Sequence, residues 1–191
     1  CEGNESYLHG GYDDGDSSGL INYVRIEFAG YRYNDDTELN ALGLFGVGFG
    51  TSLSFIQCHM SSDDGFEMFG GRCNLDHIVS TANEDDQIDC ADNYQGTIDY
   101  AAVAVVRTGD SLIELDGNGD EFSAANNSFV TIKHLTGLFE SDSAGADMAT
   151  LWRQNGEYTL QDSYIAVNGF LSGNLICMEA DGTALSLNTS V

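Results

Sequence analysis

The sequence predicts an all-β chain that winds as a parallel β-helix, a solenoid of about six stacked rungs with insertions at the corners. The first observation behind this prediction is an internal repeat. Residues 51–93 give nearly the same pattern twice, with Leu53 over Leu75 and Asp64 over Asp86 at one offset of 22 residues. The second observation is that each half holds two short alternating runs of apolar and polar residues and no helical period. Two short strands at a fixed repeat are typical of one solenoid rung.

The third observation is the turn chemistry. The chain has no proline and 23 glycines, so glycine must supply most of the turns between strands. With 191 residues and 42% hydrophobic content, the chain can bury one sizeable core. We therefore expect a single β-helix domain over residues 1–191. The missing end caps predict that it is a fragment of a longer solenoid or pairs with other subunits.

The elements follow in chain order from the alternation. A polar acidic loop over residues 1–18 precedes the first strand at 20–30, and Leu42 and Leu44 hold the second-strand positions of that rung. The first strands of successive rungs are then predicted at six apolar anchors, which are Ile21, Leu53, Leu75, Ile98, Val130 and Leu160. The steps between anchors are unequal, which predicts insertions at rung corners, where solenoids often bind ligands.

The same alternation predicts which side chains stack inside. Three interior files are expected, namely Val24, Ile56, Ile78 and Ala101; Ile26, Cys58, Ser80, Val103 and Ile165; and Phe66, Ile88 and Ile113. Lys133 falls where the pattern asks for a core residue, so the alternation breaks there. Cys58, Cys90 and Cys177 are interpreted as small core residues, which leaves disulfides open for Cys1 and Cys73.

The charge balance excludes several classes of partner. There are 31 acidic and 6 basic residues, a formal net charge of -25, so nucleic acid and anionic membrane surfaces would be repelled. Cations, basic surfaces and neutral glycans fit better. The longest apolar run, Ala101 to Val106, is far too short for a transmembrane segment.

Three stretches carry a resemblance to a known family. They read GGYDDGDSSGLINYVRIEFAG, ELNALGLFGVGFGTSLSFIQCHMSSDDGFEMFGG and EDDQIDCADNYQG. They resemble a family of Asp/Gly-rich right-handed parallel β-helix proteins, strongly over residues 10–96 and weakly over 151–181. The resemblance implies a right-handed coil in a bacterial protein that is secreted or anchored at the cell surface. It implies little about activity, because the function of such proteins is largely uncharacterised.

Acidic columns are the main candidate site. The predicted metal ligands are Asp63, Asp64, Asp85, Asp86, Glu67, Asp89 and Glu114, which recur at equivalent rung positions. Like charges about 4 to 5 Å apart repel by roughly 1 kcal/mol in water, and a hard cation such as Ca²⁺ would offset that repulsion. The alternative is that the Asp residues accept backbone N–H groups in turns while Glu67 and its equivalents are solvated. The loops Asp13–Asp16, Asp35–Asp36 and Asp116–Asp120 are further cation candidates.

A second interpretation of the same columns is enzymatic. The stacked Asp motifs resemble those of polygalacturonase-type glycosidases, in which Asp63, Asp64, Asp85 and Asp86 would act as acid and base. The next rung, RTGDSLIEL, has no histidine at the matching place, and the chain has no Arg-x-Lys clamp. The four histidines lie at different predicted rung positions, so each is interpreted as an isolated residue.

The sequence therefore favours a non-enzymatic, extracellular β-helix module with a structural, adhesive or self-assembling role in a bacterial surface protein or filament. Bound Ca²⁺ would stabilise it, and its partners would be further copies, neighbouring solenoid segments or glycans. The alternative is a polysaccharide-active β-helix enzyme, either a glycoside hydrolase or a lyase. A second alternative is a glycan-binding module in which Tyr31, Tyr33 and Phe49 form a stacking platform. For these three rings themselves, ordinary packing against the helix is the favoured prediction.

Overall fold

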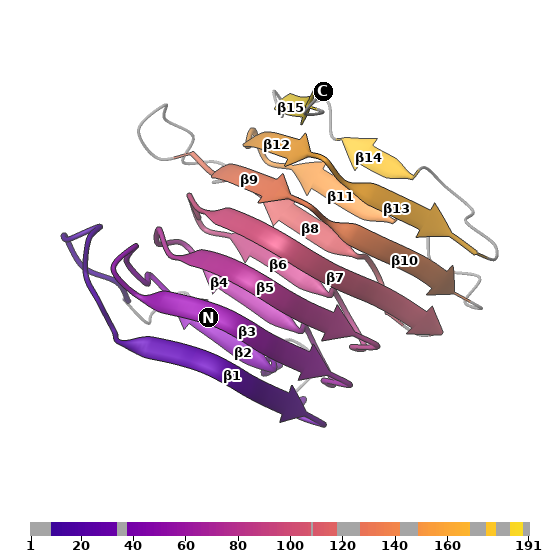
Figure 1. Cartoon of the computed structure of the whole chain (residues 1–191), viewed down its shortest axis with the longest axis horizontal. Coiled ribbons are helices and arrows are strands. Elements are labelled where there is room, and N and C mark those ends of the chain that lie inside the picture. The colour runs from indigo at the N-terminus through magenta and orange to yellow at the C-terminus, as the bar shows by residue number, and fades with distance from the viewer. Residues whose placement is uncertain are drawn as a thin grey trace.

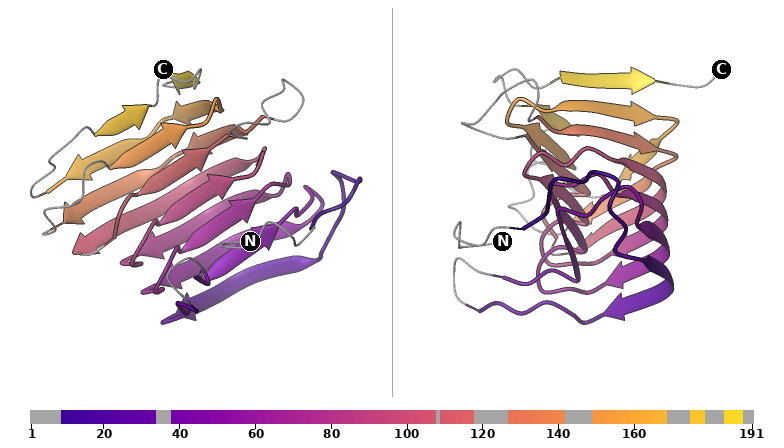
Figure 2. Two further views of the ribbon diagram at one scale, coloured as in Figure 1. Left: turned by 180° about the vertical axis from the view of Figure 1, so that it is seen from behind. Right: turned by 90° about the vertical axis from the view of Figure 1, so that its left-hand side faces the viewer.

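The chain forms a parallel β-helix built from two sheets that face each other, as the computed structural model shows (Figures 1 and 2). The structure describes residues 9–33, 38–107, 109–117, 127–141, 149–168, 175–178 and 184–188. Every strand pairing among these residues is parallel. Two strands per repeat and parallel stacking confirm the predicted fold class.

Each rung contributes to both sheets. The nine-stranded sheet runs in the order β1 (Leu20–Glu27), β3 (Ser52–His59), β5 (Asn74–Thr81), β7 (Thr97–Arg107), β9 (Phe129–Lys133), β12 (Glu157–Gln161) and β15 (Ala184–Asn188), with β10 (Thr136–Ser141) beside β7 and β13 (Tyr164–Val167) beside β10. The six-stranded sheet runs in the order β2 (Leu42–Phe45), β4 (Phe66–Phe69), β6 (Ile88–Ala91), β8 (Ile113–Asp116), β11 (Thr150–Arg153) and β14 (Ile176–Met178).

The 22-residue offset sets the register of the central rungs. Leu53 pairs with Leu75, and Phe66 pairs with Ile88. The stacking of the three predicted files is confirmed, except that Gly137 stands between Val103 and Ile165 in the second file. Val24, at the end of the first file, is 37% exposed, so the prediction that it lies in the interior is wrong. Because successive residues of a strand point to opposite faces, this register directs the apolar set of every rung into one core.

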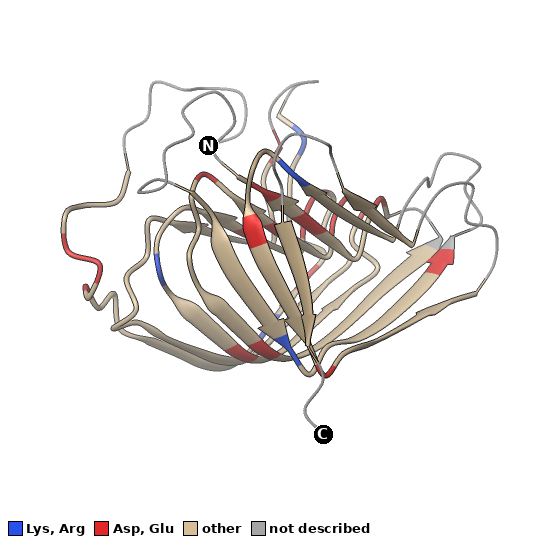
Figure 3. Cartoon of the chain, turned by 90° about the horizontal axis from the view of Figure 1, so that it is seen from above, with Lys and Arg blue, Asp and Glu red and all other residues tan. Residues whose placement is uncertain are grey.

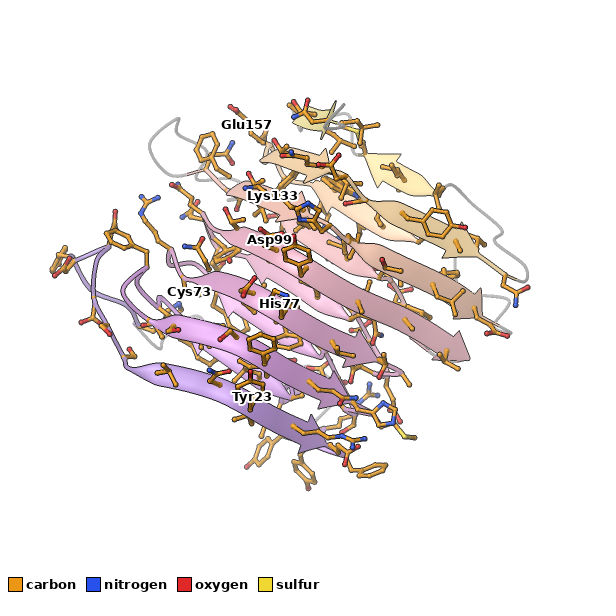
Figure 4. The ribbon with its side chains drawn as sticks, viewed as in Figure 1. Tyr23, Cys73, His77, Asp99, Lys133 and Glu157 are labelled. Atoms are coloured by element: carbon orange, nitrogen blue, oxygen red, sulfur yellow. The ribbon has the colours of Figure 1, made fainter. Side chains whose placement is uncertain are left out.

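The predicted anchor Val130 is wrong by two residues. Ile98 pairs with Ile132, whereas Val130 pairs with Tyr158. A shift of two residues keeps every side chain on the same face, so both Val130 and Ile132 are buried and the alternation alone could not separate them. Lys133 pairs with Asp99 on the outer face and does not lie in the core (Figure 4).

The cysteines are mostly core residues. Cys58 and Cys90 are fully buried as predicted, and Cys73 is equally buried. Cys177 is only partly buried. All four have free thiols, so a disulfide at Cys73 is not formed with any described cysteine. Cys1 lies outside the described residues.

Candidate cation site

The corners that lead into β4 and β6 carry pairs of aspartates, and one aspartate of each pair binds the next rung. Asp64 Oδ1 accepts a hydrogen bond from the backbone N–H of Asp86 at 2.9 Å. Asp86 Oδ1 does the same for the N–H of Ser111 at 2.9 Å. The alternative prediction, that these aspartates accept hydrogen bonds from backbone N–H groups, is therefore confirmed for Asp64 and Asp86. Each uses one carboxylate oxygen to bind the backbone of the next rung, and these bonds hold successive corners in register along the helix axis.

A buried amide network fixes the conformation of this corner. Asn83 is fully buried; its Oδ1 accepts the N–H of Ser61 at 2.9 Å, and its Nδ2 donates to Ser80 Oγ and Gln87 Oε1, both at 2.8 Å. Ser80 Oγ in turn donates to the carbonyl of Gln87 at 2.7 Å. Because buried polar groups are costly when unpaired, this network holds the acidic turn in one conformation.

A column of carboxylates follows on the adjacent strands. Glu67 of β4 pairs with Asp89 of β6, which pairs with Glu114 of β8, as the repeat predicted. Glu67 is only 3% exposed, because Asn40 lies beside it and donates from Nδ2 to Glu67 Oε2. The idea that Glu67 is solvated is therefore wrong. Figure 3 shows acidic residues on neighbouring strands of this sheet.

Three overlapping groups of carboxylates have the geometry of a cation site. In each group one oxygen from every member lies within 4.8 Å of the others, and the groups are Asp63, Asp64 and Asp85; Asp64, Glu67 and Asp89; and Asp85, Asp86 and Asp110. The second group has an independent observation that points to a ligand. Asp89 Oδ1 and Asn40 Oδ1 are both buried and accept no hydrogen bond. Unpaired buried acceptors are costly, and hard cations bind carboxylate and amide oxygens.

Burial and mutual repulsion make these carboxylates hard to ionise. Burial raises the pKa of Asp64 well above its ordinary value, and Asp86 and Glu67 raise it further. Burial likewise raises the pKa of Asp89, with Asp64 and Glu67 the nearest negative neighbours. The same causes act on Asp86, whose pKa is raised by burial and by Glu114. A divalent cation would remove this penalty by neutralising the repelling charges.

The far end of the column is neutralised by an arginine. Arg153 Nε contacts Asp116 Oδ1 at 2.5 Å, and its guanidinium also pairs with Glu114. Burial still raises the pKa of Glu114 to about 7, although Arg153 opposes that rise. Glu114 therefore belongs to an ion-pair network at the edge of the site. It stands outside the three carboxylate groups, unlike the other six predicted ligands.

The sequence missed Asn40, Asp110 and the partners of Glu114. Asn40 precedes Asp64 by the same offset of 24 residues that relates Leu42 to Phe66, so the repeat contained the signal. Asp13–Asp16 are not part of any carboxylate group among the described residues. The loop at 35–36 and residues 118–120 lie outside the described residues, and Asp116 pairs with Arg153.

A family model described as "Pectate-lyase like beta helix domain" matches residues 3–189. The chain belongs to this pectate-lyase-like β-helix family. No curated protein and no solved structure matched the sequence. The match confirms that the chain belongs to a family of parallel β-helix proteins, as the resemblance in the sequence implied. The narrower group of Asp/Gly-rich secreted bacterial proteins stays a prediction. No described helix has the length and apolar character needed to cross a bilayer.

The outer face of the nine-stranded sheet carries a second column, which corrects the prediction for two histidines. His77 and His134 are not at different rung positions. They belong to one exposed stack of rings, which runs Tyr23, Phe55, His77, Tyr100 and His134 with neighbouring centroids 4.4 to 4.8 Å apart. All five residues adopt φ between +49° and +55°, and Figure 4 shows Tyr23 and His77 along this face.

The loop aromatics of this pectate-lyase-like chain do not pack into the helix. Tyr31, Tyr33 and Phe49 are 62%, 75% and 60% exposed, so the prediction that they pack against it is wrong. Exposure alone does not make them a stacking platform, because a platform needs rings that share one plane.

Proposed function

We propose that this pectate-lyase-like chain is a non-enzymatic, calcium-stabilised β-helix module of a surface or secreted protein. In this proposal a divalent cation binds between Asp64, Glu67 and Asp89, with Asn40 as a fourth ligand. The observation that carries the proposal is the buried Asp89 Oδ1, which has no hydrogen-bond partner. Asp89 also brings one carboxylate oxygen within 4.8 Å of oxygens of Asp64 and Glu67.

The type of donor atom supports calcium as the bound cation. Three carboxylates and an amide supply only oxygen atoms, which suit Ca²⁺ or Mg²⁺ and not the softer metals that prefer histidine or cysteine. Ca²⁺ tolerates irregular geometry and six to eight ligands, and water can supply the ligands that the protein does not. Extracellular modules bind Ca²⁺ with dissociation constants of about 10⁻⁴ to 10⁻³ M, which is the range we expect. An extracellular location is part of this proposal.

The structural role follows from where the cation would sit. Glu67 and Asp89 belong to adjacent strands of the six-stranded sheet, and Asp64 bonds the backbone of the next rung. A cation bound to all three would tie two rungs together across the outer face. It would also lower the self-repulsion of a chain whose formal net charge is -25.

Calcium binding can be measured directly by isothermal titration calorimetry on chelator-treated protein. We expect saturable binding of Ca²⁺ to the wild type and at least a tenfold weaker affinity in Asp89→Asn. Glu157→Gln is the matched control, because it removes one exposed carboxylate from β12 in the other sheet (Figure 4). Absence of binding by the wild type, or equal affinity in Asp89→Asn, would refute the proposal.

A polysaccharide-active enzyme is the second candidate, and the family match fits it at least as well as a non-enzymatic role. The candidate acid and base would be Asp63, Asp64, Asp85 and Asp86. Against this stands the use of Asp64 and Asp86 as acceptors for backbone N–H groups. Among basic residues with described side chains, only Arg153 lies on the six-stranded sheet, and it is held by Glu114 and Asp116.

The two candidates separate in an activity assay. Neutral and acidic polysaccharides would be incubated with the protein in calcium chloride, and reducing ends and unsaturated products would be followed. The leading proposal expects no turnover. Product release that disappears in Asp86→Asn would replace it with the enzyme. Self-association, adhesion and neighbouring solenoid segments stay predictions, which sedimentation of the purified chain at high concentration would test.

A further inference from the structure

An exposed column of rings crosses the outer face of the nine-stranded sheet. Its members lie on five successive rungs, with ring centroids 4.4 to 4.8 Å apart and ring planes 10° to 26° from parallel, and they are Tyr23, Phe55, His77, Tyr100 and His134. Tyr23 is 77% exposed and Tyr100 is 49% exposed, and Figure 4 shows Tyr23 and His77 on the same face. Aromatic surface that stays exposed and repeats in this way points to a ligand.

The backbone conformation explains why these rings face outward. At each of the five positions φ lies between +49° and +55°, so the strand bends there and the strict alternation of faces is interrupted. In β5, Asp76 and His77 both face outward, between the buried residues Leu75 and Ile78. The residue before each ring therefore belongs to a second outward row, which holds in register Ser54, Asp76, Asp99 and Lys133.

Carboxylates of that row anchor the two imidazole rings. His77 Nδ1 lies 2.9 Å from Asp76 Oδ2, and His134 Nδ1 lies 2.7 Å from Asp99 Oδ1. These contacts restrict rotation of the imidazoles and keep both of them stacked on Tyr100, which lies between them. The column is therefore ordered before any ligand arrives, which lowers the entropic cost of binding.

The charge beside the column favours a cation. The outward row sets two carboxylates, those of Asp76 and Asp99, against one lysine, Lys133. The whole chain adds a formal net charge of -25. Such a field raises the local concentration of cations and repels anions. A ligand of this face should therefore carry positive charge.

The shape of the column favours a long, flat molecule. Within the stack each ring covers the face of its neighbour, so a ligand meets ring edges, in the edge-to-face arrangement that aromatic pairs prefer. On the side away from the acidic row, the next outward residues of β5 and β7 are Val79 and Ala102, whose side chains are shorter than a ring. A flat molecule can lie against several rings when its long axis follows the stack. An added peptide strand does not fit, because it needs the unpaired backbone groups of a sheet edge.

We propose that the ring column binds an elongated, planar aromatic cation, which lies along the stack and crosses several strands. Its π face rests on the edges of Phe55, His77 and Tyr100, and its positive charge lies beside Asp76 and Asp99. The site is separate from the cation site, whose Glu67 and Asp89 belong to the six-stranded sheet. The proposal therefore does not depend on calcium binding.

Thioflavin T is the probe, because it is a long, flat cation whose fluorescence rises when a binding site restricts rotation between its rings. Titration of the metal-free protein should give a saturable rise. The ligand efficiency typical of a molecule of this size gives a dissociation constant of the order of 10 to 100 µM. Aggregates would be removed by ultracentrifugation before and after the titration. No saturable rise, or a signal found only in the sedimented aggregates, would overturn the proposal.

Two comparison ligands separate the contribution of shape from that of charge. Congo red is long and flat but negatively charged, and spermine is a long cation without rings. In equilibrium dialysis neither should displace thioflavin T at about tenfold excess over the dye. Displacement by Congo red would contradict the charge argument, and displacement by spermine would show that charge alone carries the binding. Either result would overturn the proposal.

Variants locate the dye on the column. Tyr100→Ala removes the ring between the two imidazoles and should weaken binding at least about fivefold, whereas Tyr100→Phe keeps the ring and should bind normally. Asp76→Asn removes one half-exposed charge and should weaken binding about two- to threefold. This second variant decides the question if Tyr100→Ala proves unstable.

Phe45→Ala is the matched control. It breaks a stack of two rings on the other sheet, where Phe45 and Phe69 have centroids 4.6 Å apart, and it should leave dye affinity unchanged. Wild-type affinity in both Tyr100→Ala and Asp76→Asn would place the dye elsewhere and overturn the proposal. A loss in Phe45→Ala as large as that in Tyr100→Ala would do the same.

Discussion

Replacing Asp89 by Asn should change stability in opposite directions with and without calcium. In metal-free protein the substitution removes a buried charge that faces Asp64 and Glu67, so the variant should be more stable than the wild type. In calcium it removes a ligand, so the variant should be less stable than the wild type. A residue with a purely structural role would shift stability in the same direction under both conditions.

The magnitude follows from the geometry of the cluster. At the 4.8 Å that bounds the oxygens of these three residues, two ionised carboxylates repel by about 3 kcal/mol at an effective dielectric constant of about 20. The raised pKa values of Asp64 and Asp89 mean that protonation already relieves part of this repulsion. We therefore expect a gain of about 1 to 2 kcal/mol without metal, or a Tm higher by roughly 2 to 8 °C.

Calcium should reverse the order. A ligand at one hundred times its dissociation constant stabilises the native state by about 2.7 kcal/mol, and Asp89→Asn should lose most of that gain. Thermal unfolding would be followed by circular dichroism in chelator and in calcium chloride, with Glu157→Gln as the control. If calcium leaves the Tm of the wild type unchanged, or if Asp89→Asn is less stable than wild type in chelator, the reasoning fails.

Four further predictions concern Glu114, Arg153, the buried amide network and the exposed ring stack. Because the pKa of Glu114 rises from 4.5 to about 7 on folding, this one group should contribute a loss of about 3 kcal/mol of stability to the metal-free chain between pH 4 and pH 8; Glu114→Gln should make the pH dependence shallower in denaturant titrations, and equal slopes would contradict it. Arg153→Met should cost about 1 to 3 kcal/mol, as measured by urea unfolding, because it removes the cation that faces Glu114 and Asp116; Asp116→Asn in the same chain should restore part of the loss, and simple additivity would contradict the ion-pair network. Asn83→Ala should cost about 2 to 4 kcal/mol in the same assay, since it leaves buried polar groups without partners, and a loss below 1 kcal/mol would disprove the importance of that amide. Tyr100→Ala should lower stability by about 1 to 2 kcal/mol through loss of two ring stacks, and an unchanged Tm would show that the exposed stack is not stabilising.

The fold could be predicted from the sequence because a strand has a period of two and a solenoid repeats it at fixed offsets. The pairings of Leu53 with Leu75 and of Phe66 with Ile88 follow from that arithmetic. The pairing of Ile98 could not be predicted in the same way. The insertion before β9 hides the register, and Val130 and Ile132 satisfy the alternation equally well.

The sequence predicted which carboxylates line up on adjacent strands, but it did not predict how deeply these carboxylates are buried. The repeat aligns Glu67 with Asp89, but the coverage of Glu67 by Asn40 depends on how the preceding corner folds. The ring stack was missed because its members vary between Tyr, Phe and His and share only a backbone conformation.

Diffraction from crystals grown in calcium chloride, recorded at a wavelength where calcium scatters anomalously, tests the cation site most directly. The proposal predicts an anomalous peak about 2.3 to 2.6 Å from oxygens of Asp64, Glu67 and Asp89, and no peak there in Asp89→Asn crystals. Wild-type density in calcium with no anomalous peak among these three side chains would contradict it.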